Sequence, residues 1–346
     1  MSQSPNNQVR SCRTKLGLTQ AQLAERAGIS RTAVTAIEGE RLVPSVAAAL
    51  ALAEAMGTTV EDLFGQTASQ AQREVWAWPP ASGASRAWRA EIDGRIVNYP
   101  ASSVPMMTPL PDRLATASKT SLADETLVLA SCDPAAGILA SQYLAATGLR
   151  MIVLPRSSRQ ALEMLRDGLV HLAGLHLSTN DEPRRNADLV QTLLGNDYQL
   201  VRVARWQEGI AVAPSAGVRS VRAAVSKSFR WVGREPGSGA RHCQDRLLGG
   251  RPAPRRLARN HWSVVDAVQS GWVDAGICVQ LVSEEAGLNF LPVQEEAYDV
   301  CFPNRLASDR RVTSFLSVIR SMTYRNLIGE LPGYDAKETG EVWSLT

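Results

Sequence analysis

The sequence is poor in the residues that build disulfide frameworks and metal centres. It has five cysteines and four histidines in 346 residues. The cysteines are scattered and odd in number, and no CxxC, HxH or HExxH motif occurs. A disulfide framework and a zinc knuckle both need paired cysteines at short spacing, so neither is predicted. The spacing indicates no metal site.

Long apolar runs and catalytic motifs are also absent. No apolar stretch reaches the roughly 18 residues of a membrane span, and the first residues, MSQSPNNQ, are polar, unlike a secretory leader. The sequence contains no P-loop and no GxGxxG motif. It shows neither a nucleophile paired with a base nor metal ligands at a suitable spacing. We therefore predict a cytoplasmic protein that is not an enzyme, needs no cofactor and makes no membrane contact.

The length predicts two or three domains, because 346 residues are too many for one ordinary core. Residues 1–66 carry five short helical patterns. Thr19, Ser30 and Ser45 are good helix N-caps, and Gly28 is a good stop. The spacing predicts one buried face in the first part of this segment, formed by Leu16, Leu23, Ala24 and Ala27.

Two of these helices are joined by the tight turn at residues 27–30, which is typical of a helix-turn-helix. The stretch GLTQAQLAERAGISRTAVTAIEGERLVPS resembles the Cro/lambda-repressor-like (Xre-type) family. In such proteins the early residues of the second helix meet base edges in the major groove. The resemblance implies that Ser30, Arg31, Thr32 and Thr35 face bases. It also implies that Gln20 and Arg41 hold phosphates.

An alternative interpretation of this segment is a small helical bundle with a solvated polar face, since its six basic and six acidic residues balance. The basic residues come early and the acidic ones mostly late, so a basic face remains compatible with the balance. One module makes few contacts to double-stranded operator DNA. We therefore expect a nucleoid-associated homodimer or higher homo-oligomer.

Residues 67–123 predict a β-rich connector. RAWRAEI and RIVNY flank Asp93-Gly94, a hairpin signal, and read as paired strands. Trp76, Trp78 and Trp88 are expected to form a small core rather than to stack on nucleobases. An extended stretch without helix is then marked by Pro100, Pro105, Pro109 and Pro111.

Residues 124–330 alternate strand and helix patterns with short loops, which predicts an open, mainly parallel sheet. Two such α/β halves, joined by long strand-like crossings near 200–213 and 297–303, predict two lobes with a cleft. Residues 331–346 are expected to be a tail. Ligands collect at the carboxyl ends of strands in such sheets, and the polar residues there are Ser131, Cys132, Asp133, Ser157, Ser158 and His176.

The C-terminal half resembles the type 2 periplasmic-binding-protein superfamily, and more narrowly the molybdate-binding-protein-like domain found behind helix-turn-helix modules. The resemblance rests on SCDPA, RSSRQALEMLRDGLVHLAGLHL, REPGSGAR, SVVDAVQSGWVDAGI and EEAYDVCFP, in that order. The chain departs from such relatives at Cys132, where a histidine is expected, and at Ala240, where a threonine is usual. The resemblance implies a small anionic effector, either an oxyanion such as molybdate or tungstate or a carboxylated metabolite.

The turn Gly237-Ser238-Gly239 predicts an anion pocket, because four N–H groups at a helix start lack internal partners and the helix dipole favours an anion. The N–H groups of Ser238, Gly239 and Ala240 are the expected donors. Arg234 and Arg241 are expected either to add a charged clamp or merely to flank the turn. Ser157 and Ser158 occupy an equivalent turn of the other lobe, and Tyr298 is a candidate for the cleft wall.

Plainer interpretations of these residues stay open. The glycine-rich turn can be simply a tight connection, and His176 and Asp133 can be satisfied structural polar groups. Our hypothesis is a transcription regulator in which effector binding controls the helix-turn-helix module. The alternatives are a C-terminal partner-docking or assembly module, or a metal or redox sensor built on Cys132, His176 and Cys301.

We expect Arg31→Ala to weaken operator binding by about 1–3 kcal/mol, the usual worth of a good side-chain–base contact. Fluorescence anisotropy with operator and random duplexes measures the loss. An equal loss on both duplexes would place Arg31 on phosphate instead of a base.

Overall fold

The computed structural model describes residues 7–64, 73–80, 86–101, 111–113, 122–249 and 251–345. The chain divides into two compact units, Met1–Glu74 and Val75–Thr346, which we describe separately. Among the helices of the described residues, none combines the length and apolar character needed to cross a bilayer.

The first unit is a bundle of five helices, as predicted: α1 (Val9–Lys15), α2 (Gln20–Arg26), α3 (Arg31–Glu38), α4 (Val46–Met56) and α5 (Val60–Phe64). The side chains of Thr19, Ser30 and Ser45 each accept a backbone N–H at the start of the following helix, which confirms the three N-caps. Leu16 is a correction, since 52% of its surface is exposed. It follows the last residue of α1 as the C-cap, so it leaves the buried face that the helical spacing assumed.

A four-stranded sheet contains the predicted hairpin. Its strands are β1 (Arg73–Trp76), β2 (Arg86–Ile92), β3 (Arg95–Pro100) and β4 (Asp112–Arg113), in the order β1-β3-β2-β4. Asp93 and Gly94, between β2 and β3, both have positive φ, which suits a type I′ turn. Pro105 and Pro109 lie outside the described residues.

This sheet packs on the α/β domain through a shared apolar core. Trp88 and Tyr99 belong to one cluster with side chains from the domain. The Tyr99 hydroxyl donates to the carbonyl of Leu169 at 2.6 Å. Arg150 is a buried side chain whose guanidinium pairs with Asp112 of β4 at 2.8 Å. The connector sheet is therefore joined to the α/β domain by buried polar contacts as well as by apolar packing.

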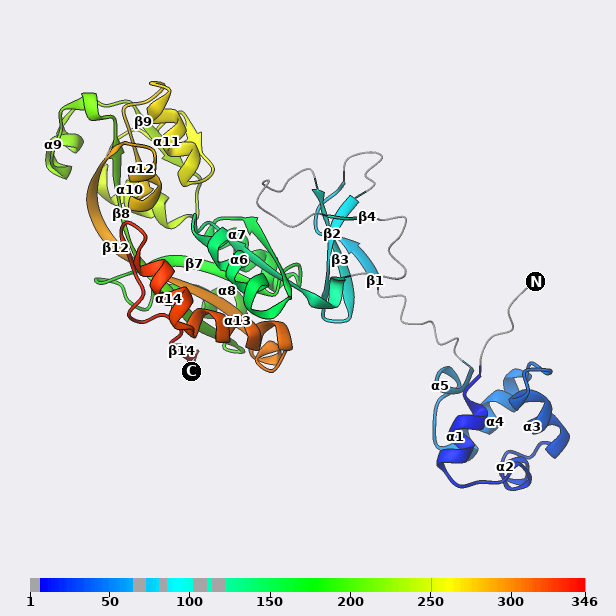
Figure 1. Cartoon of the computed structure of the whole chain (residues 1–346). Helices are drawn as coiled ribbons and strands as arrows, with labels where there is room; N and C mark the ends of the chain where they lie inside the picture. The colour runs from blue at the N-terminus through cyan, green and yellow to red at the C-terminus, as the bar shows by residue number, and fades with distance from the viewer. Residues whose placement is uncertain are drawn as a thin grey trace. The chain divides into compact units, whose positions relative to one another are not determined.

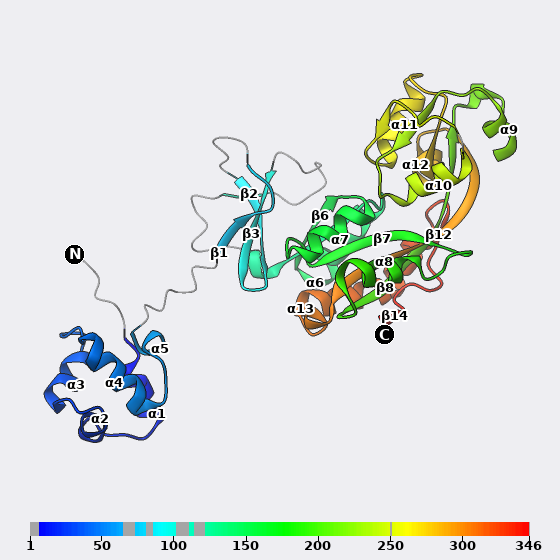
Figure 2. The same ribbon diagram turned by 180° about the vertical axis from the view of Figure 1, so that it is seen from behind.

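The rest of this unit is one ten-stranded sheet that runs through both predicted lobes. Its main path has the order β10-β9-β11-β8-β12-β7-β5-β6. Two long antiparallel strands, β8 (Tyr198–Val212) and β12 (Asn289–Pro303), pair along nearly their whole length and connect the lobes. Figures 1 and 2 show these two strands passing from one lobe to the other. They are the long crossings that the sequence predicted.

The remaining elements divide between the lobes. The first lobe contains β5 (Thr126–Ser131), β6 (Arg150–Pro155), β7 (Leu172–Thr179), α6 (Ala136–Thr147), α7 (Ser158–Arg166), α8 (Arg185–Leu194), α13 (Arg310–Arg320) and α14 (Met322–Gly329). The second contains α9 (Val221–Ser226), β9 (Trp231–Arg234), α10 (Gly239–Leu247), β10 (Leu257–Ala258), α11 (His261–Gln269), β11 (Ala275–Val279) and α12 (Gln280–Glu285). Short 3-10 turns cover Leu122–Glu125, Pro214–Ala216 and Asn304–Leu306.

The last residues, expected to be a tail, add two short strands to the sheet. Strands β13 (Tyr334–Asp335) and β14 (Val342–Ser344) both pair with β8. Tyr334 is buried, and its ring lies 5.7 Å from that of Trp206. The C-terminal segment is thus packed against the strand that connects the lobes.

We expect Asp112→Asn to lower the free energy of unfolding by about 3–5 kcal/mol, because it leaves the buried Arg150 guanidinium without its charged partner. Asp167→Asn is the matched control, since Asp167 pairs with Arg166 and both side chains are 52% exposed. A surface pair contributes about 0–1 kcal/mol. Chemical denaturation measures the free energy of unfolding of both variants. If both substitutions lower it by the same small amount, there is no buried ionic connection between connector and lobe.

Candidate functional site

The candidate site lies where the two lobes meet, between strands β8 and β12. Strand β5 and strand β7 approach it from the first lobe, and β9 and β11 approach from the second. The first turns of α7, α10 and α11 begin here after Ser157, Ser238 and Asn260. This is the carboxyl edge at which open α/β sheets collect their ligands.

His176 of β7 is completely buried and paired with a carboxylate. Its Nδ1 lies 2.7 Å from Oε2 of Glu296, which also accepts the Trp206 indole N–H at 3.1 Å. Burial alone would lower the pKa of His176, but the charges of Cys132 and Glu296 raise it well above its usual value. His176 is therefore an imidazolium that donates Nδ1–H to Glu296. Its Nε2 has no hydrogen-bond partner among the described residues.

Glu208 of β8 lies beside this pair and is protonated. Burial, followed by the charge of Glu296, raises the pKa of Glu208 well above its usual value. The pKa of Glu296 itself stays low, because His176 and hydrogen-bond donors outweigh the effect of burial. Two adjacent buried carboxyl groups cannot both be charged at low cost, so one keeps its proton.

His261 begins α11 in the opposite lobe and is also buried. Its Nδ1 accepts from the backbone N–H of Val279 at 3.3 Å and from the Arg234 guanidinium at 3.2 Å. Burial and the nearby Arg234 charge lower the pKa of His261 well below its usual value, so the ring is neutral. Since Nδ1 only accepts, the single proton is on Nε2. That Nε2 has no partner in the part of the chain that the structure describes.

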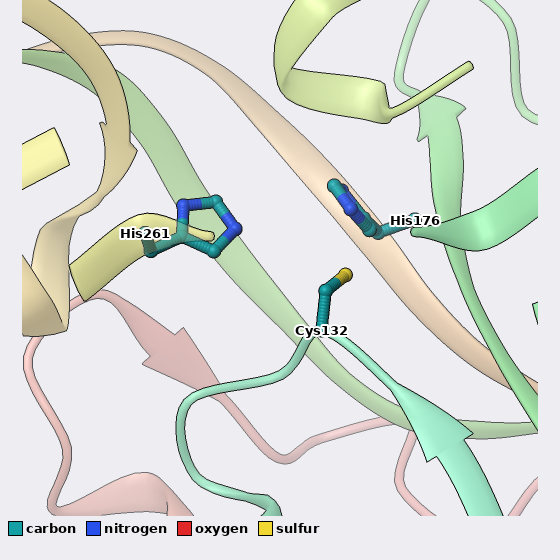
Figure 3. A group of neighbouring side chains, drawn as sticks. All are labelled: Cys132, His176 and His261. Atoms are coloured by element: carbon teal, nitrogen blue, oxygen red, sulfur yellow. The ribbon is translucent and has the colours of Figure 1, made fainter. Parts of the chain in front are cut away.

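Cys132 follows β5 and completes a group with the two histidines. One potential ligand atom from each of the three residues lies within 4.8 Å of the others. Figure 3 shows the cysteine sulfur and both rings turned toward a common space. The ring centroids of His176 and His261 are 6.1 Å apart.

These three residue types are common zinc ligands, but their protonation does not fit a metal ion. A metal bound through Nε2 of His261 needs a lone pair there and a proton on Nδ1. Val279 N–H and Arg234 can only donate, so both occupy the Nδ1 lone pair and hold the proton on Nε2. The positive guanidinium of Arg234 also opposes a cation. The group therefore presents hydrogen-bond donors rather than metal ligands.

Ser131, Asp133 and Tyr298 form a second buried network with Tyr334. The hydroxyls of Ser131 and Tyr298 lie 2.6 Å apart, and the Tyr298 ring stacks on Trp206 with centroids 4.9 Å apart. Asp133 Oδ1 accepts from the Tyr334 hydroxyl at 2.6 Å and from the N–H of Ala135 at 2.9 Å. Burial raises the pKa of Asp133 to about 6, although both donors oppose the rise.

The two serines of the first lobe differ in their contacts. The Ser158 hydroxyl accepts the backbone N–H of His176 at 3.3 Å, so it supports that strand. The Ser157 backbone N–H donates to Gln160 at 3.2 Å. The Ser157 side chain forms a capping box with Gln160, and its buried O–H has no acceptor among the described residues.

The glycine-rich turn of the second lobe packs against His176. A Cβ added to Gly239 would lie 2.5 Å from the His176 carbonyl oxygen, so only glycine allows this approach. The Ser238 hydroxyl accepts the N–H of Arg241 at 3.2 Å and thereby caps α10. Arg241 pairs with Asp245 of the same helix at 2.8 Å. Arg234 differs, because its buried guanidinium has no carboxylate partner within the described residues and its Nε is unpaired.

A pocket of about 260 Å³ opens beside this turn and is lined from both lobes and from β12. Arg185 of α8 and His242 of α10 contact each other across it, with 3.2 Å between Nη2 and Nδ1. Gly239 and Glu296 belong to its wall, so it adjoins the histidine group.

The sequence did not single out His261, Glu296, Trp206 or Tyr334. A signal existed for His261, which stands at a helix start directly after the N-cap Asn260. Glu296 lies within a long strand, and Tyr334 reaches the site only through the pairing of β13 with β8. Cys301, considered together with Cys132 and His176, lies in the apolar core beside Ala173 and Leu200.

In the helix-turn-helix unit, the side chains of Arg31, Thr32 and Arg41 are exposed. The Ser30 hydroxyl caps α3, and the Thr35 hydroxyl donates to the Arg31 carbonyl at 2.9 Å. Gln20 donates to Glu38 at 2.8 Å.

Glu38 also forms an ion pair with Arg13 of α1. Burial opposes ionisation of Glu38, but the hydrogen bonds from Arg13 and Gln20 lower its pKa. This ionic contact joins α1, α2 and α3 below the exposed face.

Two family models match the chain. One described as a PBP superfamily domain matches residues 141–320, and one described as a helix-turn-helix matches residues 9–63. YvgK, an uncharacterized protein of Bacillus subtilis, is 26% identical over 197 residues, which cover 54% of this chain and 63% of YvgK. An uncharacterized HTH-type transcriptional regulator of Methanothermobacter thermautotrophicus is 44% identical over 57 residues, 16% of this chain and 83% of that protein.

Solved structures with a similar arrangement share little sequence with the chain. One is described as the tungstate ABC transporter from Geobacter sulfurreducens, with a TM-score of 0.47, 12% identity, and coverage of 60% of this chain and 99% of that one. Another is described as an ABC-type phosphate transport receptor from Vibrio cholerae, with a TM-score of 0.44, 13% identity, and the same coverage of both chains.

We expect Asp133→Asn to gain stability relative to the wild type as pH rises. The folded-state pKa of Asp133 is raised, so its contribution is complete at low pH and is lost as pH rises through about 6. The asparagine keeps an acceptor for Tyr334 and Ala135 but never bears a charge. The difference in unfolding free energy between variant and wild type should grow by about 2 kcal/mol from pH 4.5 to 7.5. Urea denaturation at both pH values measures it, and a difference independent of pH would contradict the buried charge.

Proposed function

The chain belongs to the PBP superfamily, and on that premise we propose that its cleft binds a small oxyanion-type effector that controls DNA binding. With the helix-turn-helix at residues 9–63, the protein is a transcriptional regulator rather than an enzyme. The identity of the bound anion and its effect on DNA binding are our proposals.

The buried, unpaired donors around the histidine group carry this proposal. The atoms are Ser157 Oγ, His176 Nε2, Arg234 Nε and His261 Nε2, and they come from both lobes. A buried donor without a partner costs about 1–3 kcal/mol, and more when it is charged. An anion held between these groups would accept hydrogen bonds from several of them and recover that cost.

The charges support an anion as well. His176 and Glu296 neutralise each other, Glu208 keeps its proton and His261 is neutral. The guanidinium of Arg234 remains as a positive charge without a carboxylate partner among the described residues. A buried charge of this kind is stable only when it is paired, and a bound anion would supply the partner.

Tetrahedral oxyanions such as molybdate and tungstate are our first candidates for the effector, because they offer acceptors in several directions. A carboxylated metabolite satisfies the same donors. In either case the side chains that donate hydrogen bonds to the effector would come from both lobes. Gly239 packs against His176, one of these donors.

Control of DNA binding follows from linkage. A ligand changes DNA affinity only by the difference between its affinities for the two functional states, typically about 1–3 kcal/mol. We propose that the regulator acts as a homodimer, since one helix-turn-helix module makes few contacts and paired half-sites raise the affinity.

Isothermal titration calorimetry with molybdate, sulfate and phosphate tests the effector. We expect Arg234→Gln to weaken binding of the preferred anion by about 10- to 100-fold, as expected for a lost charge-assisted contact worth about 1.5–3 kcal/mol. Arg241→Gln is the matched control from the same turn. Because Arg241 pairs with Asp245, its replacement should change the affinity by about twofold or less.

Absence of heat with all three anions would remove the inorganic oxyanion from the proposal. If Arg241→Gln loses more affinity for the anion than Arg234→Gln does, the anion binds at the helix start instead of at the buried guanidinium. Melting temperatures of both variants separate a binding defect from a folding defect.

A further inference from the structure

We propose that Cys132 is a reactive thiol, oxidised by hydrogen peroxide to a sulfenic acid, which gives this regulator a second chemical input. The proposal goes beyond effector binding and stands without it, because the thiol and its partners are present in the chain itself.

The position of Cys132 distinguishes it from the other cysteines of its unit. Cys132 is half-buried, whereas Cys243, Cys278 and Cys301 are buried. Burial raises the pKa of all three buried thiols, that of Cys278 to about 12. Only a partly exposed thiol can meet a dissolved oxidant and still be held by its neighbours.

Two independent features of the surroundings indicate thiol chemistry. A ring nitrogen of His176 and one of His261 lie within 4.8 Å of the sulfur, and Figure 3 shows both rings turned toward it. The Nε2 atoms of these two buried rings have no other partner among the described residues. An oxygen atom added to the sulfur would come within hydrogen-bond reach of the Nε2–H of His261, a donor that otherwise has no acceptor among the described residues.

The charge of His176 explains why the sulfur is activated. As an imidazolium fixed by Glu296, it stabilises negative charge on the adjacent sulfur and can release the proton on Nε2. Other titratable or charged groups surround the sulfur from several elements: the neutral His261 of α11 with Arg234 behind it, Asp133 after β5, and Tyr298 of β12. The imidazolium of His176 carries a full positive charge and has a ring nitrogen within 4.8 Å of the sulfur.

The oxidation balances without any further reagent. The thiolate of Cys132 attacks one oxygen of hydrogen peroxide, an S–O bond forms, and the O–O bond breaks. Sulfur loses two electrons, and the departing hydroxide takes the Nε2 proton of His176 to become water. The product is Cys132 sulfenic acid beside a neutral histidine, and a cellular thiol can reduce it.

Cys12 provides an internal control for the experiment. It is also free and half-buried, but it lies on α1 of the helix-turn-helix unit. The reduced full-length protein, without DNA or added anions, is treated with iodoacetamide, or with hydrogen peroxide and dimedone. Peptide mass spectrometry then gives separate rates for Cys132 and Cys12.

We expect Cys132 to react about tenfold or more faster than Cys12 at pH 6.5. His176→Gln should bring the Cys132 rate to that of Cys12. His242→Gln, at an exposed histidine of α10, should leave the Cys132 rate within about twofold.

Equal rates for Cys132 and Cys12 in the wild type would overturn the proposal, even if His176→Gln does not fold. If Cys132 reacts rapidly and His176→Gln does not change its rate, the reactivity results from exposure of the thiol. That result would also overturn the role of the imidazolium. These results are independent of calorimetry, so failure of oxyanion binding leaves them unchanged.

Discussion

The ion pair between His176 and Glu296 organises the centre of this protein. It joins β7 of one lobe to the crossing strand β12, and Gly239 of the other lobe packs directly on the same histidine. A buried imidazolium is stable only with its carboxylate, and the carboxylate in turn receives the Trp206 indole N–H. Once this pair is in place, Glu208 must stay protonated and Nε2 of His176 must face the cleft as a donor.

The same constraint decides what kind of ligand the centre suits. His261 is held by two donors to Nδ1, so its free nitrogen also carries a proton. Arg234 adds a permanent positive charge. Donors and positive charge from both lobes favour an anion and oppose a metal ion, although cysteine and histidine side chains converge. The residue types alone would have suggested a metal ion, because cysteine and histidine are common metal ligands.

The connector shows how the fold extends beyond the two lobes. Its sheet shares an apolar core with the first lobe, and Glu91 and Asp112 pair with Arg311 and Arg150. The predicted hairpin at Asp93-Gly94 is present. What the local sequence did not indicate is that these strands are joined to the α/β domain by ion pairs, because the partner residues lie far along the chain.

The sequence by itself determined the elements and their order: the capped helices of the first unit, the hairpin, the alternating strands and the long crossings β8 and β12. These depend on periodicity, caps and turns, which are local. It also singled out His176, Arg234 and Tyr298 as candidate site residues. Tertiary structure alone decided that Arg234 contacts His261 and has no carboxylate partner among the described residues, and that Glu296, His261 and Tyr334 reach one centre. Protonation, burial and pairing depend on neighbours from distant segments, and no local pattern records them.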